Sequence, residues 1–352
     1  MKKTVLYDRL AELGGKFVEF GGFFMPVQFL GILGEHRAVR SGVGIFDVSH
    51  MGEFLLEGEN AEKEINYLFT NDFSKMPAGK VRYTLMCNTD GGIVDDLLVY
   101  KVNDAKYYLV VNASNIDKDR EHILTNLKYG SKFTDLSDKI SMIAVQGPLA
   151  AALTGEIFGK LPEGFYTFIF SKFAGHDVVV SRTGYTGEDG FEIYSENALT
   201  VDILNELLKF NDKYNTALAG LGSRDTLRLE SAMPLYGHEM NAETLATELG
   251  LDAYIKIGKA DFVGKAALTS KKPKYRRIGL KITDKGIARE GCKVLNGSEE
   301  IGHVTSGTMS PTLGYSVAMA RVGVDSDTSD IYVDVRGRPL KAEAVAMPFY
   351  KR

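Results

Sequence analysis

The sequence lacks any long apolar run and has only two cysteines among its 352 residues. No stretch approaches the ~18 apolar residues of a membrane-spanning helix, so we expect no membrane-spanning segment. The first fifteen residues likewise contain no apolar run of the length that a signal peptide needs. Cys87 and Cys292 lie far apart and form no Cys-x-x-Cys motif. Free thiols in a reducing, cytoplasmic compartment are therefore expected.

The chain also lacks an excess of positive charge, with a formal net charge of −4. That balance gives no general affinity for phosphate backbones, so nucleic acid is not an expected partner. The six histidines show no metal-ligand spacing, and we expect no metal. Hydrophobic residues make up 44% and charged residues 25% of the chain. This composition is typical of a soluble globular protein, and the length suits roughly two or three domains.

The stretch from Tyr83 to Tyr100 combines a turn signal with two adjacent acids in an apolar run. Asp-Gly-Gly at 90–92 predicts a β-hairpin, because glycine accepts positive φ. Asp95 and Asp96 follow within the second strand, where neighbouring side chains point to opposite faces. We expect one acid to face inward, where a carboxylate needs partners, and the other to face solvent. A strand end with two solvated acids is the alternative, and these residues leave it open.

The pattern of apolar residues changes near residue 275. Before it, predicted strands and helices mix without a strict βαβ order, which indicates an α+β fold. From Ile278 onward, short apolar runs alternate with turn residues and predict a small all-β unit, either a sandwich or a barrel. The segment 265–277 just before this unit holds six basic residues and no acid.

Two further segments carry groups suited to a ligand. The glycine-punctuated run 182–192 is either a tight surface hairpin or a place where the backbone approaches a ligand closely. Its Tyr185 and Glu192 suit a planar heterocycle with N–H donors. The run 221–230 reads as a helix with Arg224 and Arg228 one turn apart. For Arg228 we expect a solvated helix face.

Taken together, the motifs of this chain resemble those of the glycine cleavage T-protein family. The members of that family are tetrahydrofolate-dependent aminomethyltransferases. The resemblance covers nearly the whole chain, and the combination is specific although no single motif is. It is carried, in order, by VGIFDVSHMGEF, TNDF, GGIVDDLLVY, QGP, SRTGYTGEDGFE, GSRDTLRLE, LYGHEM, DFVGKAAL and VTSGTMSPTLGYSVAMA.

The resemblance implies a multi-domain ring around a folate channel. The implied domains are 1–54 with 146–274, an inserted α+β domain at 55–145, and a β-barrel-like domain at 275–352. Asp96 is implied as the catalytic acid beside the reacting nitrogens of folate. The residues implied around the ligand are Tyr83, Tyr100, Asn112, Tyr185, Glu192 and Arg224. One departure is the segment Ser231–Pro234, where family members commonly carry other, often aromatic, residues.

The implied reaction transfers a one-carbon unit from an S-aminomethyl-dihydrolipoyl carrier, the H-protein, to tetrahydrofolate. The products are 5,10-methylenetetrahydrofolate, ammonia and the dihydrolipoyl carrier. Alternatives of the same fold are another folate-dependent demethylase and a non-enzymatic folate-binding factor for iron–sulfur assembly. The second typically carries a cysteine in a K-G-C-Y-x-G-Q-E segment, whereas the matching place here reads R-T-G-Y-T-G-E-D-G.

The basic segment allows two interpretations. A solvated linker between domains is the plainer one, since runs of charge usually are solvated. In the other, Lys271, Lys272 and Lys274 form a docking surface that steers an acidic lipoyl carrier.

Overall fold

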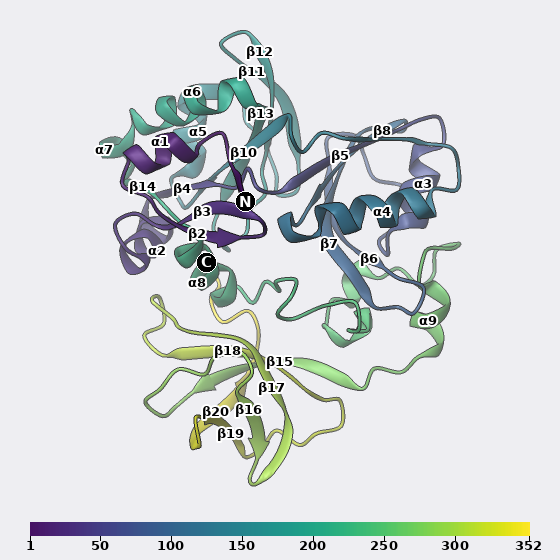
Figure 1. Ribbon diagram of the computed structural model, residues 1–352, viewed down its shortest axis with the longest axis vertical. Helices are drawn as coiled ribbons and strands as arrows, with labels where there is room; N and C mark the ends of the chain where they lie inside the picture. The colour runs from purple at the N-terminus through teal and green to yellow at the C-terminus, as the bar shows by residue number, and fades with distance from the viewer.

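The first large sheet of the computed structural model, which describes residues 1–352, has six strands in the order β11-β12-β13-β10-β4-β14 (Figure 1). Side chains alternate along each strand, so Ile143 and Val145 face one side of β10 while Met142 and Ala144 face the other. Helices α1, α5 and α6 bury the first of these faces. The elements are α1 Tyr7–Glu12, β4 Val43–Asp47, β10 Ile140–Gln146, α5 Ala150–Phe158, β11 Phe168–Phe173, β12 His176–Ser181, β13 Gly190–Glu196, α6 Asn197–Leu208 and β14 Thr216–Leu218.

The second large sheet has five strands in the order β6-β7-β8-β5-β9. Helices α3 and α4 cover one of its faces through Ile65, Leu68 and Ile123. Its other face packs against the Met142 face of the first sheet, so the two sheets share one apolar core. The elements are β5 Gly52–Glu57, α3 Ala61–Leu68, β6 Val81–Cys87, β7 Ile93–Asn103, β8 Lys106–Val111, η1 Ala113–Asn115, α4 Ile116–Asn126 and β9 Lys132–Asp135.

A small N-terminal sheet lies beside the first large sheet and precedes α2. Its three strands have the order β1-β3-β2. Helices α2 and α8 are joined by the carboxylate of Glu35, which accepts hydrogen bonds from the Gly220 N–H at 2.9 Å and the Ser223 hydroxyl at 3.2 Å. These contacts fix the start of α8. The elements are β1 Lys2–Lys3, β2 Lys16–Phe20, β3 Phe23–Gln28, α2 Ile32–Ser41, α7 Asn211–Tyr214 and α8 Leu221–Glu230.

The segment 231–274 leads from α8 across to the β6–β7 hairpin and contains η2 (Ala246–Glu248), η3 (Asp252–Tyr254) and α9 (Lys265–Ser270). Leu245 and Phe262 of this segment pack against Leu85 and Ile93 of the hairpin. At the turn, a Cβ on Gly92 would lie 1.8 Å from the Ala242 carbonyl oxygen. Only glycine therefore allows the segment to approach the hairpin so closely.

The C-terminal strands close into a barrel in the order β15-β18-β17-β16-β19-β20. The bounds are β15 Tyr275–Ile282, β16 Lys293–Asn296, β17 Glu299–Met309, β18 Ser316–Gly323, β19 Ile331–Val335 and β20 Arg338–Val345. Closure leaves no unpaired sheet edge, and the barrel has an apolar core of its own. The prediction of an α+β fold with a small all-β C-terminal unit is confirmed.

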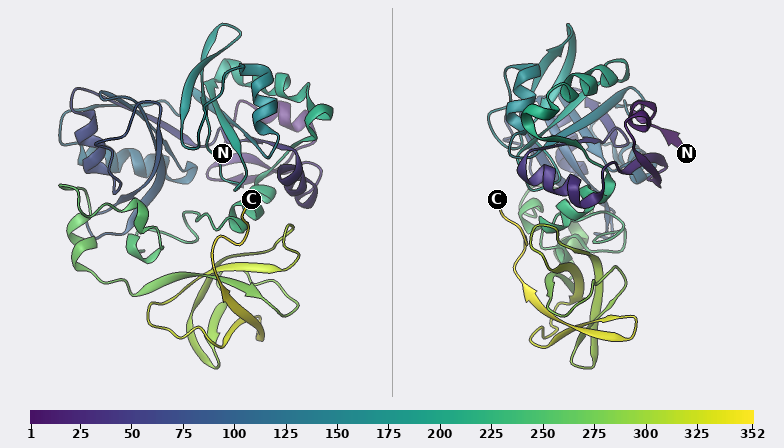
Figure 2. Two further views of the ribbon diagram at one scale, coloured as in Figure 1. Left: turned by 180° about the vertical axis from the view of Figure 1, so that it is seen from behind. Right: turned by 90° about the vertical axis from the view of Figure 1, so that its left-hand side faces the viewer.

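The three sheet-based lobes surround a common centre, and the chain end returns from the barrel to α8 (Figures 1 and 2). The five-stranded sheet spans residues 52–135 and so interrupts the six-stranded lobe, whose strands lie on both sides of it in the sequence. The division into 1–54 with 146–274, 55–145 and 275–352 follows these lobes, and we keep it as a proposal. Every helix is too short or too polar to span a bilayer.

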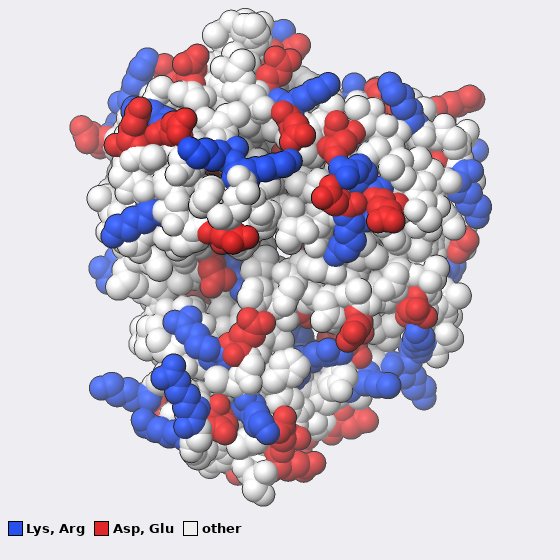
Figure 3. Space-filling view, in the orientation of Figure 1, with Lys and Arg blue, Asp and Glu red and all other residues white.

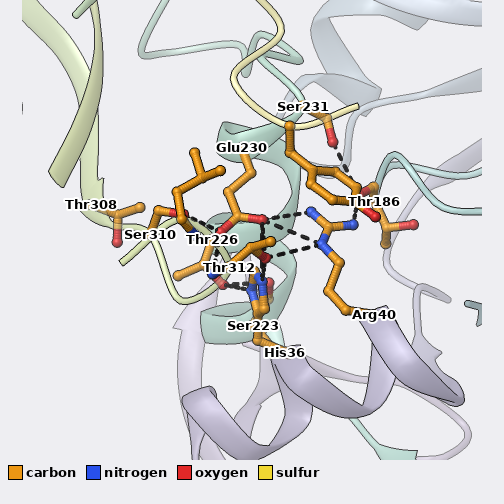
Figure 4. A network of polar contacts seen from close by, with 12 residues as sticks. His36, Arg40, Thr186, Ser223, Thr226, Glu230, Ser231, Thr308, Ser310 and Thr312 are labelled. Atoms are coloured by element: carbon orange, nitrogen blue, oxygen red, sulfur yellow. Dashed lines mark hydrogen bonds and ion pairs between the residues drawn. The ribbon is translucent and has the colours of Figure 1, made fainter. Parts of the chain in front are cut away.

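A buried polar network holds the barrel against α2 and α8 (Figure 4). The Glu230 carboxylate lies 3.2 Å from His36 Nε2 and accepts hydrogen bonds from Arg40 at 2.8 Å and Thr312 at 2.7 Å. Although burial opposes it, hydrogen bonds from His36 and Ser310 lower the pKa of Glu230 to about 2. The Tyr350 N–H donates to the Glu230 carbonyl oxygen at 2.8 Å, which ties the chain end to the same helix.

Candidate active site

A cavity of about 370 Å³ lies between the two large sheets and the segment 231–254. Such a volume lies within the usual range for small-molecule sites, about 300–1,000 Å³. No barrel strand contributes to its lining. The sequence-predicted site residues that line it are Tyr83, Asp96, Asn112, Tyr185, Glu192 and Arg224.

Tyr100 lies behind the wall of this cavity rather than on it. Its side chain is 2% exposed, and its hydroxyl lies 2.7 Å from the Tyr194 hydroxyl. It lines a separate cavity of about 240 Å³ between the two sheets. Tyr194 in turn lies 3.5 Å from Glu192, so Tyr100 reaches the main cavity only through other side chains.

Asp96 points into the cavity from the middle of β7 and is held from both sides. The Tyr83 hydroxyl donates to its Oδ2 at 2.9 Å, and the Asn112 amide donates to its Oδ1 at 2.9 Å. Burial, with the nearby Asp95 carboxylate, raises the pKa of Asp96 to about 7. At neutral pH this group can therefore exist with or without its proton, which suits electrostatic and proton-handling roles.

Asp95 lies on the opposite face of β7, but that face is not solvated. Asp95 is 0% exposed, because α4 covers this side of the sheet. Its carboxylate accepts hydrogen bonds from the Asn112 N–H at 3.0 Å and from the Asn115 amide at 2.6 Å. The expectation of one solvated acid, and its alternative of two, are both wrong. Alternation along a strand separates two faces but does not show which of them a helix covers.

Glu192 lies on β13 with one carboxylate oxygen occupied and the other free. Oε2 accepts hydrogen bonds from the Thr183 hydroxyl at 2.5 Å and the Tyr194 hydroxyl at 3.5 Å. No donor of the chain approaches Oε1. Burial raises the pKa of Glu192, while the bond from Thr183 and the charge of Arg224 oppose the rise. Glu192 can therefore accept hydrogen bonds from N–H donors of a ligand.

Arg224, in the first turns of α8, is a cation without a hydrogen-bond partner for its guanidinium. Its guanidinium carbon lies 4.8 Å from the centre of the Tyr185 ring, and the Tyr185 hydroxyl donates to the Pro234 carbonyl at 2.5 Å. Burial lowers the pKa of Arg224, although the charge of Glu192 opposes this. Five N–H donors on a planar group suit a carbonyl or anionic acceptor on a ligand.

The expectation of a solvated Arg228 is wrong, because its side chain is 2% exposed. Its guanidinium donates to Asp225 at 2.8 Å, to Glu239 at 3.0 Å and to Ser306 of the barrel at 2.8 Å. The helix face that carries Arg228 packs against the barrel, a contact between distant segments that helical spacing does not reveal.

Several cavity residues were not predicted from the sequence. Tyr166 lines the cavity from a loop and Tyr254 from the end of η3, and the Tyr254 ring lies 4.8 Å from the Tyr83 ring. Burial, with the charge of Arg224, lowers the pKa of His50 to about 3, so this imidazole is neutral. The sequence segment SHM at 49–51 gave a signal for His50, but no periodicity marks the two tyrosines. Met233 and Pro234, in the unusual Ser231–Pro234 segment, also form part of the wall.

An outer cleft of about 880 Å³ adjoins the cavity. The two share Tyr83, Tyr166 and Tyr254 in their linings. The outer cleft also carries Arg82 and Lys259. These three tyrosines therefore separate a buried cavity from a wider opening with basic side chains.

In the basic segment 265–277, two arginines are half-buried and bound, whereas three lysines are exposed. Arg276 donates to the Ser326 carbonyl at 3.0 Å and Arg277 to the Ala232 carbonyl at 3.0 Å. Lys271, Lys272 and Lys274 are exposed, and Lys271 donates to the Asp90 carbonyl at 2.8 Å. The face in Figure 3 shows charges of both signs interspersed. No cluster of three or more His, Cys, Asp or Glu is arranged to hold a metal ion.

Two family models together match most of the chain. One describes the GCVT N-terminal domain and matches residues 6–259, and the other describes the glycine cleavage T-protein C-terminal barrel domain and matches residues 276–351. The boundary between them falls where the barrel begins.

Proteins named aminomethyltransferase resemble the chain over its full length. The one from Thermoanaerobacter pseudethanolicus is 42% identical over 363 residues, covering 100% of this chain and 98% of the relative. The one from Bacillus subtilis is 41% identical over 363 residues, covering 100% of both. The crystal structure of glycine cleavage system aminomethyltransferase T from Bartonella henselae is 30% identical, with a TM-score of 0.92, and the match covers 99% of this chain and 98% of that chain.

Proposed function

The chain belongs to the glycine cleavage T-protein family, and from this premise we propose that its main cavity binds tetrahydrofolate with Asp96 beside the reacting nitrogens. The protein is an aminomethyltransferase. It transfers the one-carbon unit of an S-aminomethyl-dihydrolipoyl carrier to tetrahydrofolate. The products are 5,10-methylenetetrahydrofolate, ammonia and the dihydrolipoyl carrier.

The observation that carries the proposal is a set of unsatisfied polar atoms in one cavity. Glu192 Oε1 and Asn112 Oδ1 have no donor within the chain, and the Arg224 guanidinium has no acceptor. A reduced pterin offers amino and ring N–H donors for the first two and a carbonyl oxygen for Arg224. The tyrosine rings of the wall supply flat apolar surface for such a ring system. The lining therefore fits the implied ligand.

Asp96 is the group that we expect to act on the reacting atoms. In this transfer the methylene carbon loses its bonds to the lipoyl sulfur and the amino nitrogen and gains bonds to two folate nitrogens, and positive charge develops at that carbon. A carboxylate held by Tyr83 and Asn112 stabilises this charge without reorganising. With a pKa of about 7, Asp96 can also take a proton from a folate nitrogen or return one. Asp96 then acts as an electrostatic and proton-handling group and not as a nucleophile.

Glu192 and Arg224 orient the ligand rather than react. A carboxylate acceptor and a guanidinium donor on different elements, β13 and α8, bind two different edges of a planar ring. Thr183 fixes the Glu192 carboxylate and the Tyr185 ring lies beside Arg224, so neither has to move far on binding. Orientation of this kind converts binding energy into correct placement of the reacting nitrogens.

The lipoyl-bearing H-protein is the proposed carrier, and its arm would reach Asp96 through the outer cleft. The shared lining supports this route, because the cleft and the cavity adjoin at Tyr83, Tyr166 and Tyr254. The exposed Lys271, Lys272 and Lys274 remain the proposed docking residues. We place the reaction in the cytoplasm, and the free thiols of Cys87 and Cys292 support a reducing compartment.

The test is release of ammonia from an aminomethylated carrier in the presence of tetrahydrofolate. We expect Asp96→Asn to lose most turnover while tetrahydrofolate affinity changes much less, because a positioned charge acts on the transition state. In the wild type, kcat/KM should rise with pH through about 7 as Asp96 ionises. Full turnover by Asp96→Asn would show that the transfer does not need the Asp96 carboxylate.

A further inference from the structure

A second layer of polar residues lies behind Asp96, on the far face of β7. At its centre is Asp95, which accepts three N–H donors: the Asn112 backbone at 3.0 Å, the Asn112 amide at 2.9 Å and the Asn115 amide at 2.6 Å. A buried carboxyl group with three donors and no acceptor is a stable carboxylate. Asp95 therefore carries the negative charge in this layer.

Asp119 lies on α4 one turn beyond Asn115, whose amide binds Asp95, and it is close enough for the charge of Asp95 to act on it. It is also 0% exposed, yet neither of its oxygens accepts a hydrogen bond from any N–H or O–H donor. Two neighbouring buried carboxyl groups are unfavourable as two anions, because their charges repel in a low-dielectric interior and one of them then keeps its proton. Since all the donors serve Asp95, the proton of the pair belongs on Asp119. Burial, together with Asp95, raises the pKa of Asp119 to about 11.

Other charged and titratable groups around this pair do not change the assignment. Asp96 lies on the cavity face of the same strand, and burial lowers the pKa of His122 on α4, so that imidazole is neutral. Burial, with the charge of Asp95, raises the pKa of Tyr236 to about 12, so its phenol is neutral too. Lys118 is the cation of the group. Its ammonium binds the Asn115 side-chain oxygen at 3.0 Å and lies 3.9 Å from the Tyr236 ring centre, with no ion pair to Asp119.

We propose that Asp119 is a positioning residue, which as a neutral acid donates its O–H to Asp95 and thereby fixes Asn112 and Asp96 for the reaction. The inference rests on the proposed function, because it gives Asp119 its role through Asp96. Asp119 does not line the cavity and touches no reacting atom.

The amide of Asn112 transmits this effect. Its Nδ2 donates to Asp95 Oδ1 at 2.9 Å, to Asp96 Oδ1 at 2.9 Å and to the Asp96 carbonyl at 3.1 Å. Both acids therefore bind the NH₂ end, which leaves the Asn112 carbonyl oxygen as an acceptor for the ligand. A neutral Asp119 also keeps a third negative charge away from Asp96. An ionised Asp119 would raise the pKa of Asp96 further and keep it protonated at neutral pH.

Two substitutions at the same position separate this role from a merely structural one. Asp119→Asn keeps the shape and can donate an amide N–H to Asp95, so we expect kcat within about twofold of the wild type. Asp119→Leu fills the space without a donor, and we expect kcat at pH 7 to fall about tenfold while KM for tetrahydrofolate changes less than about twofold. The pH at which kcat/KM rises should also move upward in Asp119→Leu and stay in place in Asp119→Asn.

Asp117→Asn is the matched control, because Asp117 lies on the same helix in an exposed ion pair with Arg120. We expect no change in any of these quantities for it. Equal damage from Asp119→Asn and Asp119→Leu would overturn the proposal, since the charge and not the donated proton would then be required.

A measurement without activity tests the proton itself. In the ligand-free protein with ¹³C-labelled aspartate, assigned by comparison with Asp119→Asn, the Asp119 carboxyl signal should show no ionisation between about pH 5 and pH 9. A midpoint near the ordinary value for aspartate would overturn the proposal even if Asp96 proved essential. Conversely, if Asp96→Asn kept full turnover while the Asp119 titration stayed as expected, the proposed function and not the protonation of Asp119 would be overturned.

Discussion

Replacing Asp96 by asparagine should stabilise the protein at alkaline pH and destabilise it slightly in acid. The raised pKa of Asp96, about 7 against an ordinary 3.8, means that the folded chain binds this proton more tightly than the unfolded chain. Its contribution to stability is therefore complete below pH 3.8 and is lost as the pH rises through about 7. Asparagine has no charge to bury, so the variant escapes that loss.

The size of the effect follows from the same two values. A difference of about three pKa units corresponds to ~4 kcal/mol at pH 8. Against this stands a hydrogen-bond mismatch, because asparagine has one acceptor oxygen where Asp96 has two. The amide oxygen can keep the bond from Asn112, and the Tyr83 hydroxyl must then reverse to accept, at a cost of about 1 kcal/mol. We expect a net gain of about 3 kcal/mol at pH 8, a crossover near about pH 4.5, and a small loss below it.

Urea denaturation followed by tyrosine fluorescence measures this difference between about pH 4 and pH 8.5, since the chain has 17 tyrosines and no tryptophan. Asp90→Asn removes an exposed carboxylate at the tip of the same hairpin and should give a difference near zero at every pH. A difference for Asp96→Asn that does not vary with pH would refute the reasoning, because the pKa of Asp96 would then be the same in the folded and the unfolded chain. The reasoning would also be refuted if the wild type had a higher free energy of unfolding than Asp96→Asn at pH 8.

Three further results are expected. Glu192→Gln should weaken tetrahydrofolate binding by about 1–3 kcal/mol in a direct titration, because a charge-assisted hydrogen bond is lost, and unchanged affinity would place the ring elsewhere. Charge reversal of Lys271, Lys272 and Lys274 should flatten the rise of the carrier KM with salt and leave the folate KM unchanged; a wild-type salt response would make the segment a linker only. Arg228→Met should lower the free energy of unfolding by about 3–5 kcal/mol, since it leaves a buried carboxylate without its partner, and a loss below about 1 kcal/mol would show that water replaces the guanidinium.

The hairpin and the short strands of the C-terminal unit were predictable because their signals are local, whereas the residues left a sandwich or a barrel open. Asp-Gly-Gly sets the β6–β7 turn through backbone freedom that only nearby residues influence. Short apolar runs after residue 275 with turn residues between them led to the barrel strands for the same reason. The side-chain period of two also placed Asp95 and Asp96 on opposite faces of β7 correctly.

Residues that line the cavity were predictable only where motifs carried them. Asp96 and Arg224 were assigned to the ligand through the resemblance, Glu192 was also singled out by its residue type, and the structure brings all three to one cavity. Tyr254 has no such motif, because it reaches the cavity from an irregular segment that follows α8. Tyr100 belongs to a motif but lies one layer behind the wall, since its strand turns that side chain toward the first sheet.

The sequence by itself determined which acids are available on β7 and that they face opposite ways. Only the tertiary structure decided that α4 covers one of these faces and that the segment 231–254 closes over the other. Each covering element comes from a distant part of the chain, and the N–H donors around a buried acid decide whether it keeps its proton. Asp95 is an anion because three N–H groups converge on it, and Asp119 is neutral because none does. Asp96 titrates near neutrality because burial and Asp95 raise its pKa while hydrogen bonds from Tyr83 and Asn112 lower it.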